Sequence, residues 1–231
     1  MRVALVLASL LALGQTASAD LYVPPKLVEG SIPSAPGDRT PDGAVAGVTI
    51  VGGGEVLLEV TVGKDGRVSN IGRIRVTPPY TDLVSNTVEG WRFMPAEVAS
   101  ARERRHAIES RVLVAAMYRP PALYTGTTLG EVPKDVGRPS PFIPFPHEII
   151  SPPYPPTARG TGTVLLEVDV GTDGSPRTVR VVRSGGIFDS AAIQALERWT
   201  FAPAQSDQGA VPSFAYVVMG FLEPIVAGRG R

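Results

Sequence analysis

The sequence lacks cysteine altogether and has only two histidines among its 231 residues. The absence of cysteine excludes disulfide bonds, thiolate catalysis and cysteine-ligated zinc or iron–sulfur sites. The histidines, His106 and His147, have dissimilar neighbours, and no spacing of carboxylates around them indicates a metal site. No Ser-His-Asp arrangement is recognisable either. We therefore expect a protein that is not an enzyme and that has no catalytic residues, no metal site and no cofactor.

The sequence also lacks an excess of charge of either sign, because 22 basic residues (Lys and Arg) balance 22 acidic ones (Asp and Glu). A neutral chain has no overall field that would draw it to nucleic acid or to an anionic membrane surface. Apolar residues make up 43% and charged residues 19% of the chain, as in a globular protein. These proportions exclude a wholly disordered chain, and we expect no nucleic acid among the partners.

Long apolar runs are also missing, apart from one near the N-terminus. Arg2 precedes an apolar run from Val3 to Leu13, and the small residues Ala17-Ser18-Ala19 follow it. A basic start, a short apolar run and a small-residue cleavage pattern are typical of a secretory signal peptide. The run is shorter than the roughly 20 residues that cross a bilayer. We therefore predict a cleavable signal peptide over residues 1–19 and an exported protein, with an uncleaved N-terminal anchor as the alternative.

One segment of the sequence occurs twice in nearly the same form. GEVLLEVTVGKDG begins at Gly54, and GTVLLEVDVGTDG begins 108 residues later, at Gly162. The same offset relates Trp91 to Trp199, together with the Phe and Pro-Ala residues that follow each tryptophan. Chance alternation of Val and Leu would not keep two tryptophans in register, so the sequence predicts two copies of one domain.

Each copy has the pattern of a small α+β unit. Alternating residues from Val164 to Val170 predict a strand, and Asp173-Gly174 predicts a hairpin turn. A second strand, a helix with the tryptophan on its apolar face, and a last strand follow. We therefore expect two tandem domains, each a three-stranded antiparallel sheet with a helix on one face. Glu59 and Glu167 occupy equivalent positions on the first strands, where we expect them to face solvent.

The segment between the copies is rich in proline, which predicts an extended spacer. Its apolar residues are too numerous for a free linker, so part of it should lie on a domain surface: Phe142, Ile143, Phe145, Ile149 and Ile150. The predicted organisation is a signal peptide (1–19), an extended N-terminal segment (20–43), a first domain (44–118), a proline-rich linker (119–151), a second domain (152–223) and a tail (224–231).

The second copy carries a set of motifs in a fixed order. They are Tyr154-Pro155, Asp173-Gly174, Ser184-Gly185, Asp189-Ser190-Ala191-Ala192 and Trp199-Thr200-Phe201-Ala202-Pro203. In this order, over residues 152–223, they resemble the C-terminal domain of TonB-family proteins. The first copy shares the hairpin and the tryptophan motif but lacks Tyr-Pro and Ser-Gly at the aligned places, so it resembles a diverged relative.

The resemblance implies a periplasmic protein that binds extended peptide segments of outer-membrane transporters or other envelope proteins. In the family, such a segment adds as a strand to the edge of the sheet. Carried over to this chain, the receiving edge would be the last strand of the second copy, with Tyr154 and Pro155 near it. Its residues are Phe214, Ala215, Tyr216, Val217 and Val218. Binding there would link the protein to TonB-dependent transmembrane transport and energy transduction.

Two departures from the family's transducers keep other functions open. The transducers have an N-terminal membrane helix and a spacer that precedes a single terminal domain, whereas here the N-terminus resembles a cleavable signal and the spacer separates two copies. The first alternative is an energy transducer anchored in the inner membrane by an uncleaved N-terminus, the only case in which we expect membrane contact. The second is an envelope scaffold that binds cell-wall polymer or associates with itself through its sheet edges.

Overall fold

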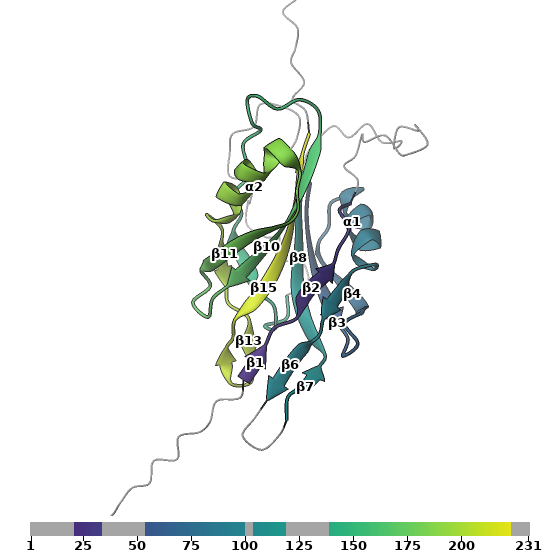
Figure 1. Cartoon of the computed structure of the whole chain (residues 1–231), viewed down its shortest axis with the longest axis vertical. Coiled ribbons are helices and arrows are strands. Elements are labelled where there is room, and N and C mark those ends of the chain that lie inside the picture. Colours follow the sequence, from purple (N-terminus) through teal and green to yellow (C-terminus); the bar gives the residue numbers. More distant parts are fainter. Residues whose placement is uncertain (1–20, 34–53, 100–103, 119–138, 223–231) are drawn as a thin grey trace, which may run out of the picture.

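The structure is a computed structural model that describes residues 21–33, 54–99, 104–118 and 139–222 (Figure 1). The predicted signal peptide, residues 119–138 of the predicted linker and the predicted tail lie outside the described residues. Within the described ranges, no helix is both long and apolar enough to cross a membrane.

A single six-stranded sheet forms the centre of the molecule, with the strand order β11-β10-β15-β8-β3-β4 (Figure 1). The first repeat (residues 54–118) contributes β3 (Gly54–Val62), β4 (Val68–Arg75) and β8 (Ser110–Tyr118). The second repeat (residues 162–221) contributes β10 (Gly162–Val170), β11 (Pro176–Arg183) and β15 (Ser213–Phe221). The predicted strand–strand–helix–strand order therefore occurs in both repeats, but the prediction of two separate three-stranded sheets is wrong.

The two halves of the sheet join through β8 and β15, which pair in parallel, whereas all other neighbours in the sheet are antiparallel. A parallel junction between equivalent last strands turns one half over relative to the other, about an axis along the strands. The helices α1 (Tyr80–Val88) and α2 (Asp189–Leu196) consequently cover opposite faces of the sheet.

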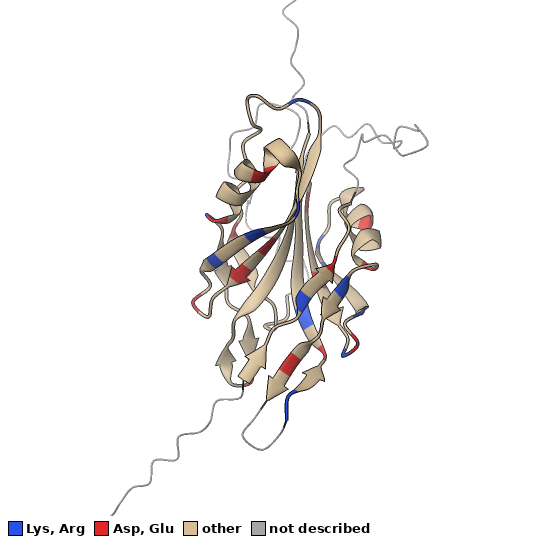
Figure 2. Cartoon of the chain, in the orientation of Figure 1, with Lys and Arg blue, Asp and Glu red and all other residues tan. Residues whose placement is uncertain are grey.

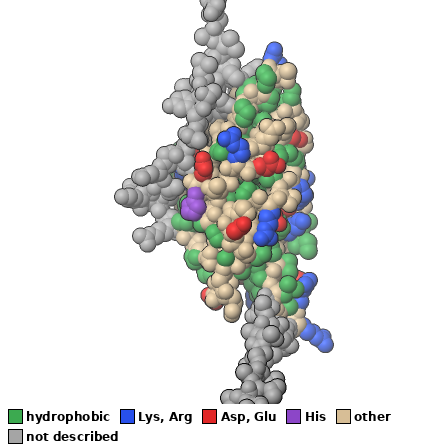
Figure 3. Space-filling model, turned by 90° about the vertical axis from the view of Figure 1, so that its left-hand side faces the viewer, with side chains coloured by type: hydrophobic (Ala, Val, Ile, Leu, Met, Phe, Trp, Pro, Cys, Tyr) green, Lys and Arg blue, Asp and Glu red, His purple; other side chains and the backbone are tan. Residues whose placement is uncertain are grey.

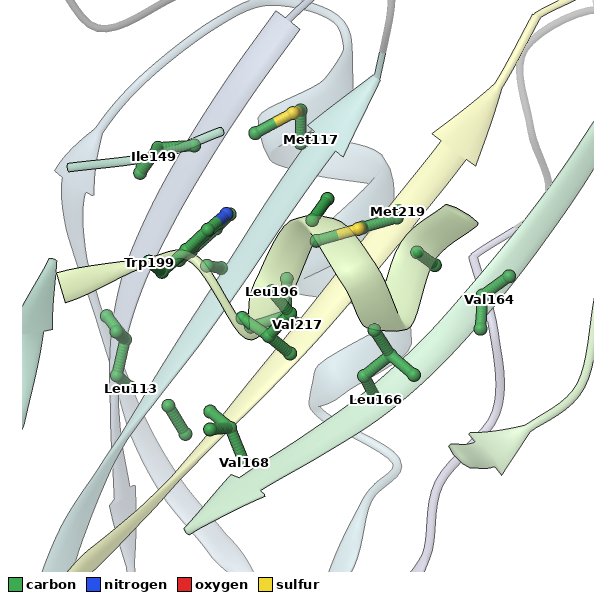
Figure 4. Close-up of a cluster of buried hydrophobic side chains, with 14 of the residues drawn as sticks. Leu113, Met117, Ile149, Val164, Leu166, Val168, Leu196, Trp199, Val217 and Met219 are labelled. Carbon is green, nitrogen blue, oxygen red and sulfur yellow. The ribbon is translucent and has the colours of Figure 1, made fainter. Parts of the chain in front are cut away.

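Each face has its own hydrophobic core, and each core takes side chains from both repeats. The α2-face core combines residues of α2, β10 and β15 with Leu113, Ala115 and Met117 of β8. Figure 4 shows Trp199 and Leu196 of the second repeat in the same core as Leu113 and Met117 of the first. The α1-face core combines the first repeat's helix and strands with residues of the second repeat, among them Tyr216.

Short strands lie outside the main sheet. They are β1 (Leu21–Val23), β6 (Ala96–Ala99) and β7 (His106–Ile108), which form a three-stranded sheet, and three pairs: β2 (Lys26–Glu29) with β5 (Arg92–Met94), β9 (Phe145–Glu148) with β12 (Thr200–Ala202), and β13 (Gln205–Ser206) with β14 (Gly209–Ala210). One turn of 3₁₀ helix, η1 (Gly186–Phe188), precedes α2.

The segments upstream of the two repeats pack in the same way. β2 pairs with the strand that follows α1, and β9 pairs with the strand that follows α2. The indole N–H of Trp91 donates to the carbonyl oxygen of Ser31, and that of Trp199 donates to the carbonyl oxygen of Ile150, both at 3.1 Å. Both tryptophans are core residues, as predicted. The expectation that part of the proline-rich segment lies on a folded surface is confirmed as well, since Ile149 is buried.

The Asp-Gly hairpins depend on glycine. Gly66 and Gly174 have φ angles of 76° and 80°, in the region that side chains disfavour. A Cβ atom at Gly174 would lie 1.9 Å from the carbonyl oxygen of Phe201, and a Cβ at Gly66 would lie equally close to that of Phe93. The tip of each hairpin thus lies directly against the strand that follows the helix.

Candidate functional site

The predicted receiving strand, β15, lies inside the sheet. β10 pairs with it along its whole length on one side, and β8 pairs with residues 215–220 on the other. Ala215, Tyr216, Val217 and Val218 lie opposite Leu113, Val114, Ala115 and Ala116, respectively. The prediction that β15 is an open edge is therefore wrong, because the first repeat occupies the position that an added strand would take.

The predicted site residues also point to different faces. Ala215 and Val217 are buried in the α2-face core, whereas Tyr216 and Val218 are buried in the α1-face core. Phe214 is only partly buried and packs at the margin of the α1-face core, where the Lys26 ammonium lies 5.7 Å from its ring centroid. In this arrangement, four of the five side chains are structural.

Tyr216 joins the two repeats and the N-terminal arm (residues 21–33). Its ring contacts Trp91 and Phe93 edge-on, with ring centroids 6.0 and 5.6 Å away. Its hydroxyl accepts a hydrogen bond from the Leu27 N–H at 2.7 Å and donates one to Glu167 at 3.2 Å. Burial raises the pKa of the Tyr216 phenol, and the Glu167 charge raises it further.

Glu167 is buried, with 4% of its surface exposed. Its carboxylate accepts two hydrogen bonds from the Arg180 guanidinium, at 3.1 and 3.0 Å, in addition to the Tyr216 hydroxyl. The expectation that Glu167 faces solvent is wrong, because the face of the second repeat opposite α2 is covered by the first repeat and the arm. A buried carboxylate that is bonded in this way stabilises a fixed geometry.

Glu59, at the equivalent position in the first repeat, has different partners. It accepts hydrogen bonds from the Arg111 side chain and from the Ser140 N–H, the latter at 3.0 Å. Burial raises the pKa of Glu59, but the hydrogen bonds from Ser140 and Arg111 outweigh it, so the net pKa lies below the usual value. Glu59 thereby ties the linker segment to the sheet and, with 13% of its side chain exposed, is not the solvent-facing residue we expected.

Tyr154 and Pro155 lie at the end of the sheet where β15 terminates. The Tyr154 hydroxyl donates to the carbonyl oxygen of Gly160 at 2.7 Å, and its ring meets Phe188 edge-on at 5.6 Å. Phe188 in turn stacks on Phe221, the last residue of β15, at 4.7 Å. The carbonyl oxygen of Pro155 accepts the Ala158 N–H. The Tyr-Pro motif thus fixes the loop that leads into β10, and its contact with a partner stays a prediction.

A cleft of about 650 Å³ opens where the N-terminal arm, the start of β8 and the β13–β14 hairpin meet. Both apolar and polar side chains line it, and its single basic residue, Arg111, is already paired with Glu59. The lining residues are Tyr22, Val98, Ile108, Glu109, Ser110, Arg111, Phe142, Gln205, Ser206, Asp207, Gln208 and Val211.

Neither histidine is among the residues that line this cleft, and the two lie on different strands. His106 is exposed on β7, where its Nδ1 contacts the carbonyl oxygen of Arg104, and His147 is exposed on β9. In the described part of the chain, no group of three His, Asp or Glu side chains is placed to hold a metal ion.

A known protein family matches the part of the chain that contains most of the second repeat. Residues 151–218 match the family model described as Gram-negative bacterial TonB protein C-terminal. These residues form a TonB C-terminal domain. The chain is also similar to protein TonB2 of Pseudomonas aeruginosa, with 41% identity over 76 residues. That alignment covers 31% of this chain and 28% of TonB2, so the chain spans less than a third of the relative it matches. The relation of the first repeat to the TonB C-terminal domain stays a prediction.

One signal in the sequence could have revealed the position of β15. Both β15 (SFAYVVMGF) and β8 (SRVLVAAMY) are almost continuously apolar in their second halves. Continuous apolar runs are typical of strands that are buried on both faces, whereas an edge over solvent alternates. This pattern indicates that both strands are buried on both faces, although it does not show which strand lies beside which.

Proposed function

We propose that this protein works in the periplasm as a TonB-like binding protein, and that it binds extended peptide segments of outer-membrane transport partners by β-strand addition. This binding would be linked to TonB-dependent transmembrane transport. The match of residues 151–218 to the TonB C-terminal domain carries the proposal. The similarity of 76 residues of the chain to TonB2 supports it.

The N-terminal sequence supports the location. Arg2, the apolar run that follows and the small residues before Asp20 are typical of export through a cleavable signal peptide. A TonB C-terminal domain behind such a signal favours a protein released into the periplasm.

Strand addition would have to occur at a place other than β15, the strand that the family resemblance indicated. With β8 paired to β15, residues 215–218 have no side available to another strand. Strand addition then requires an edge of the six-stranded sheet, since only an edge has unpaired backbone groups.

Affinity capture from the native cell envelope tests the proposal. The bait is the whole chain without residues 1–19, and an unrelated exported protein of similar size is the control bait. We expect outer-membrane transport proteins to be retained by this bait alone. Retention of cell-wall polymer only, or of nothing beyond the control, would contradict the proposal and favour the scaffold.

An anchored energy transducer is a second candidate, because the apolar run from Val3 to Leu13 would remain attached if cleavage fails. The intact mass of the protein purified from its native host distinguishes the two candidates. A mass that lacks residues 1–19 supports the released protein, and a full-length chain in the membrane fraction supports the transducer.

A further inference from the structure

The six-stranded sheet ends in β4 on one side and β11 on the other, and in the described part of the chain neither strand has a neighbour on its outer side (Figure 1). An outermost strand presents a row of unpaired N–H and C=O groups that an extended segment can join. The two edges are equivalent in the two repeats, so their differences indicate which of them is suited to a partner.

The edges differ in how their arginines are neutralised. β4 has two arginines, and both form ion pairs, Arg73 with Asp82 at 2.9 Å and Arg75 with Glu55 at 2.8 Å. β11 has three arginines and no acidic residue (Figure 2). Arg180 pairs with Glu167, whereas Arg177 and Arg183 form no ion pair among the described residues.

Two aspartates lie near the ends of β11, and each accepts its hydrogen bonds from serine or backbone groups. Asp173 accepts hydrogen bonds from the N–H and the hydroxyl of Ser175, and its charge also attracts Arg177 without forming an ion pair with it. Asp189 accepts hydrogen bonds from Ser184 and Gly185. They offset part of the positive charge without covering the arginine side chains that an added strand would meet directly.

The backbone and the apolar side chains also favour β11. β4 has Gly72 at its centre, which gives an added strand no side chain to pack on. β11 has valines between its arginines, and Val179 and Val181 are only partly buried at the margin of the α2-face core, as is Ile193 of α2. Figure 3 shows this side of the molecule, where apolar side chains lie among separate basic and acidic ones.

Self-association through β11 is disfavoured by the same charges. Antiparallel pairing of two β11 strands about their centres would place Arg177 near Arg183 of the other copy and the two Arg180 side chains near each other. Like charges directly opposite each other destabilise a sheet. The complement of this edge is a strand with acidic residues between apolar ones.

We propose that β11 is the edge that receives a partner, and that the partner is an extended segment in which acidic and apolar residues alternate. This inference rests on the proposed function, binding by strand addition, and names its site and the chemistry of its ligand. Backbone hydrogen bonds to β11 would supply the pairing, and Arg177 and Arg183 would select acidic segments.

The absence of cysteine allows a direct comparison of the two edges. Thr178 on β11 and Asn70 on β4 are both exposed and occupy equivalent positions in the two hairpins, opposite Asp169 and Thr61. Thr178→Cys and Asn70→Cys can each carry an environment-sensitive fluorophore on the whole mature chain. The probe is an eight-residue peptide of alternating glutamate and valine, with a lysine–valine peptide as its counterpart.

With the acidic peptide, we expect a saturable change in the fluorescence of the label at position 178. The change for the label at position 70 should be at least about fivefold weaker, and the lysine peptide should change the fluorescence of neither label. The double change Arg177→Glu and Arg183→Glu should weaken binding about tenfold or more, because two attractive contacts become repulsive. Arg73→Glu on β4 is the matched control and should leave binding unchanged. Thermal melting of all variants establishes that they are folded.

Equal fluorescence responses at the two edges would overturn the inference. Peptide binding of unchanged affinity after the charge reversal on β11 would also overturn it, as would concentration-dependent association of the chain without peptide. Repeating the envelope capture with the reversed variant separates this inference from the proposed function. Capture of the same transport proteins by both baits would refute the β11 site and leave the function standing. Peptide binding at position 178 without capture of any envelope protein would refute the proposed function but would still support β11 as a peptide-binding edge.

Discussion

The indole of Trp91 and the phenol ring of Tyr216 meet edge-on, with their centroids 6.0 Å apart and their planes at 79°. Trp91 follows the helix of the first repeat, whereas Tyr216 lies on the last strand of the second. The contact therefore lies in a core that neither repeat can complete alone. Loss of packing in one repeat should therefore destabilise the other. We expect the described sheet to unfold as one cooperative unit.

Tyr216→Phe should lower the free energy of unfolding by about 1–3 kcal/mol. The ring contacts remain, but the Leu27 N–H and the Glu167 carboxylate each lose a buried hydrogen-bond partner. Urea unfolding followed by tryptophan fluorescence measures the change. An unchanged midpoint would show that water or another group replaces the hydroxyl, contrary to the network described above.

Trp199→Ala should destabilise the protein by about 3–5 kcal/mol, as large-to-small changes in a core do. Trp199 is 1% exposed, packs in the α2-face core and donates to the carbonyl oxygen of Ile150. Denaturant unfolding monitored by circular dichroism measures the loss. A variant that melts like the parent would refute the assignment of Trp199 as a core residue and reopen a role in ligand stacking.

Gly174→Ala should cost more than Gly186→Ala, although both residues have positive φ angles, of 80° and 67°. A Cβ at position 174 would lie 1.9 Å from the carbonyl oxygen of Phe201, whereas a Cβ at position 186 would meet nothing within 4 Å. We expect roughly 1–2 kcal/mol for the backbone strain at position 186 and a larger loss at position 174. Equal losses in thermal unfolding would mean that the hairpin can move away from the following strand without cost.

Glu59 should make stability depend on pH in the acid range. Its pKa in the folded protein lies below the ordinary value of 4.5, so ionised Glu59 stabilises the fold above that value. The contribution is lost as the pH falls through the lowered pKa of the folded state. Glu59→Gln should therefore destabilise the protein by about 1 kcal/mol at neutral pH, and this difference should shrink in acid.

The comparison is made by urea unfolding of parent and variant at pH 7 and at a pH below the lowered pKa. A difference of the same size at both pH values would assign the effect of Glu59→Gln to packing instead of charge.

The elements could be predicted from the sequence because each follows from local patterns. Alternation from Val164 to Val170 predicts β10, and Asp173-Gly174 predicts its turn, since the glycine adopts a positive φ angle there. The prediction of the last strand, Ser213 to Phe221, agrees with β15 residue for residue. Core roles for the two tryptophans were predicted from helical spacing and are confirmed, but their placement on the helices is wrong, because α1 ends at Val88 and α2 at Leu196.

The prediction of the binding edge was wrong because local sequence patterns do not specify which strands pair with each other. Which strand lies beside β15 depends on contacts between residues about 100 positions apart, such as Tyr216 and Val114. The same junction buries the face on which Glu167 lies and turns a predicted surface carboxylate into a partner of Tyr216 and Arg180.

By itself, the sequence determined the repeated strand–strand–helix–strand unit, the tryptophan cores and the TonB-like motifs of residues 152–223, because periodicity, turn chemistry and motif order are properties of the chain. Only the tertiary structure decided that the two units share one sheet through β8 and β15, that the helices lie on opposite faces, and that β4 and β11 are the edges. Two almost continuously apolar strands gain most by burying both of their faces, and only the folded arrangement shows that each covers the other's open side.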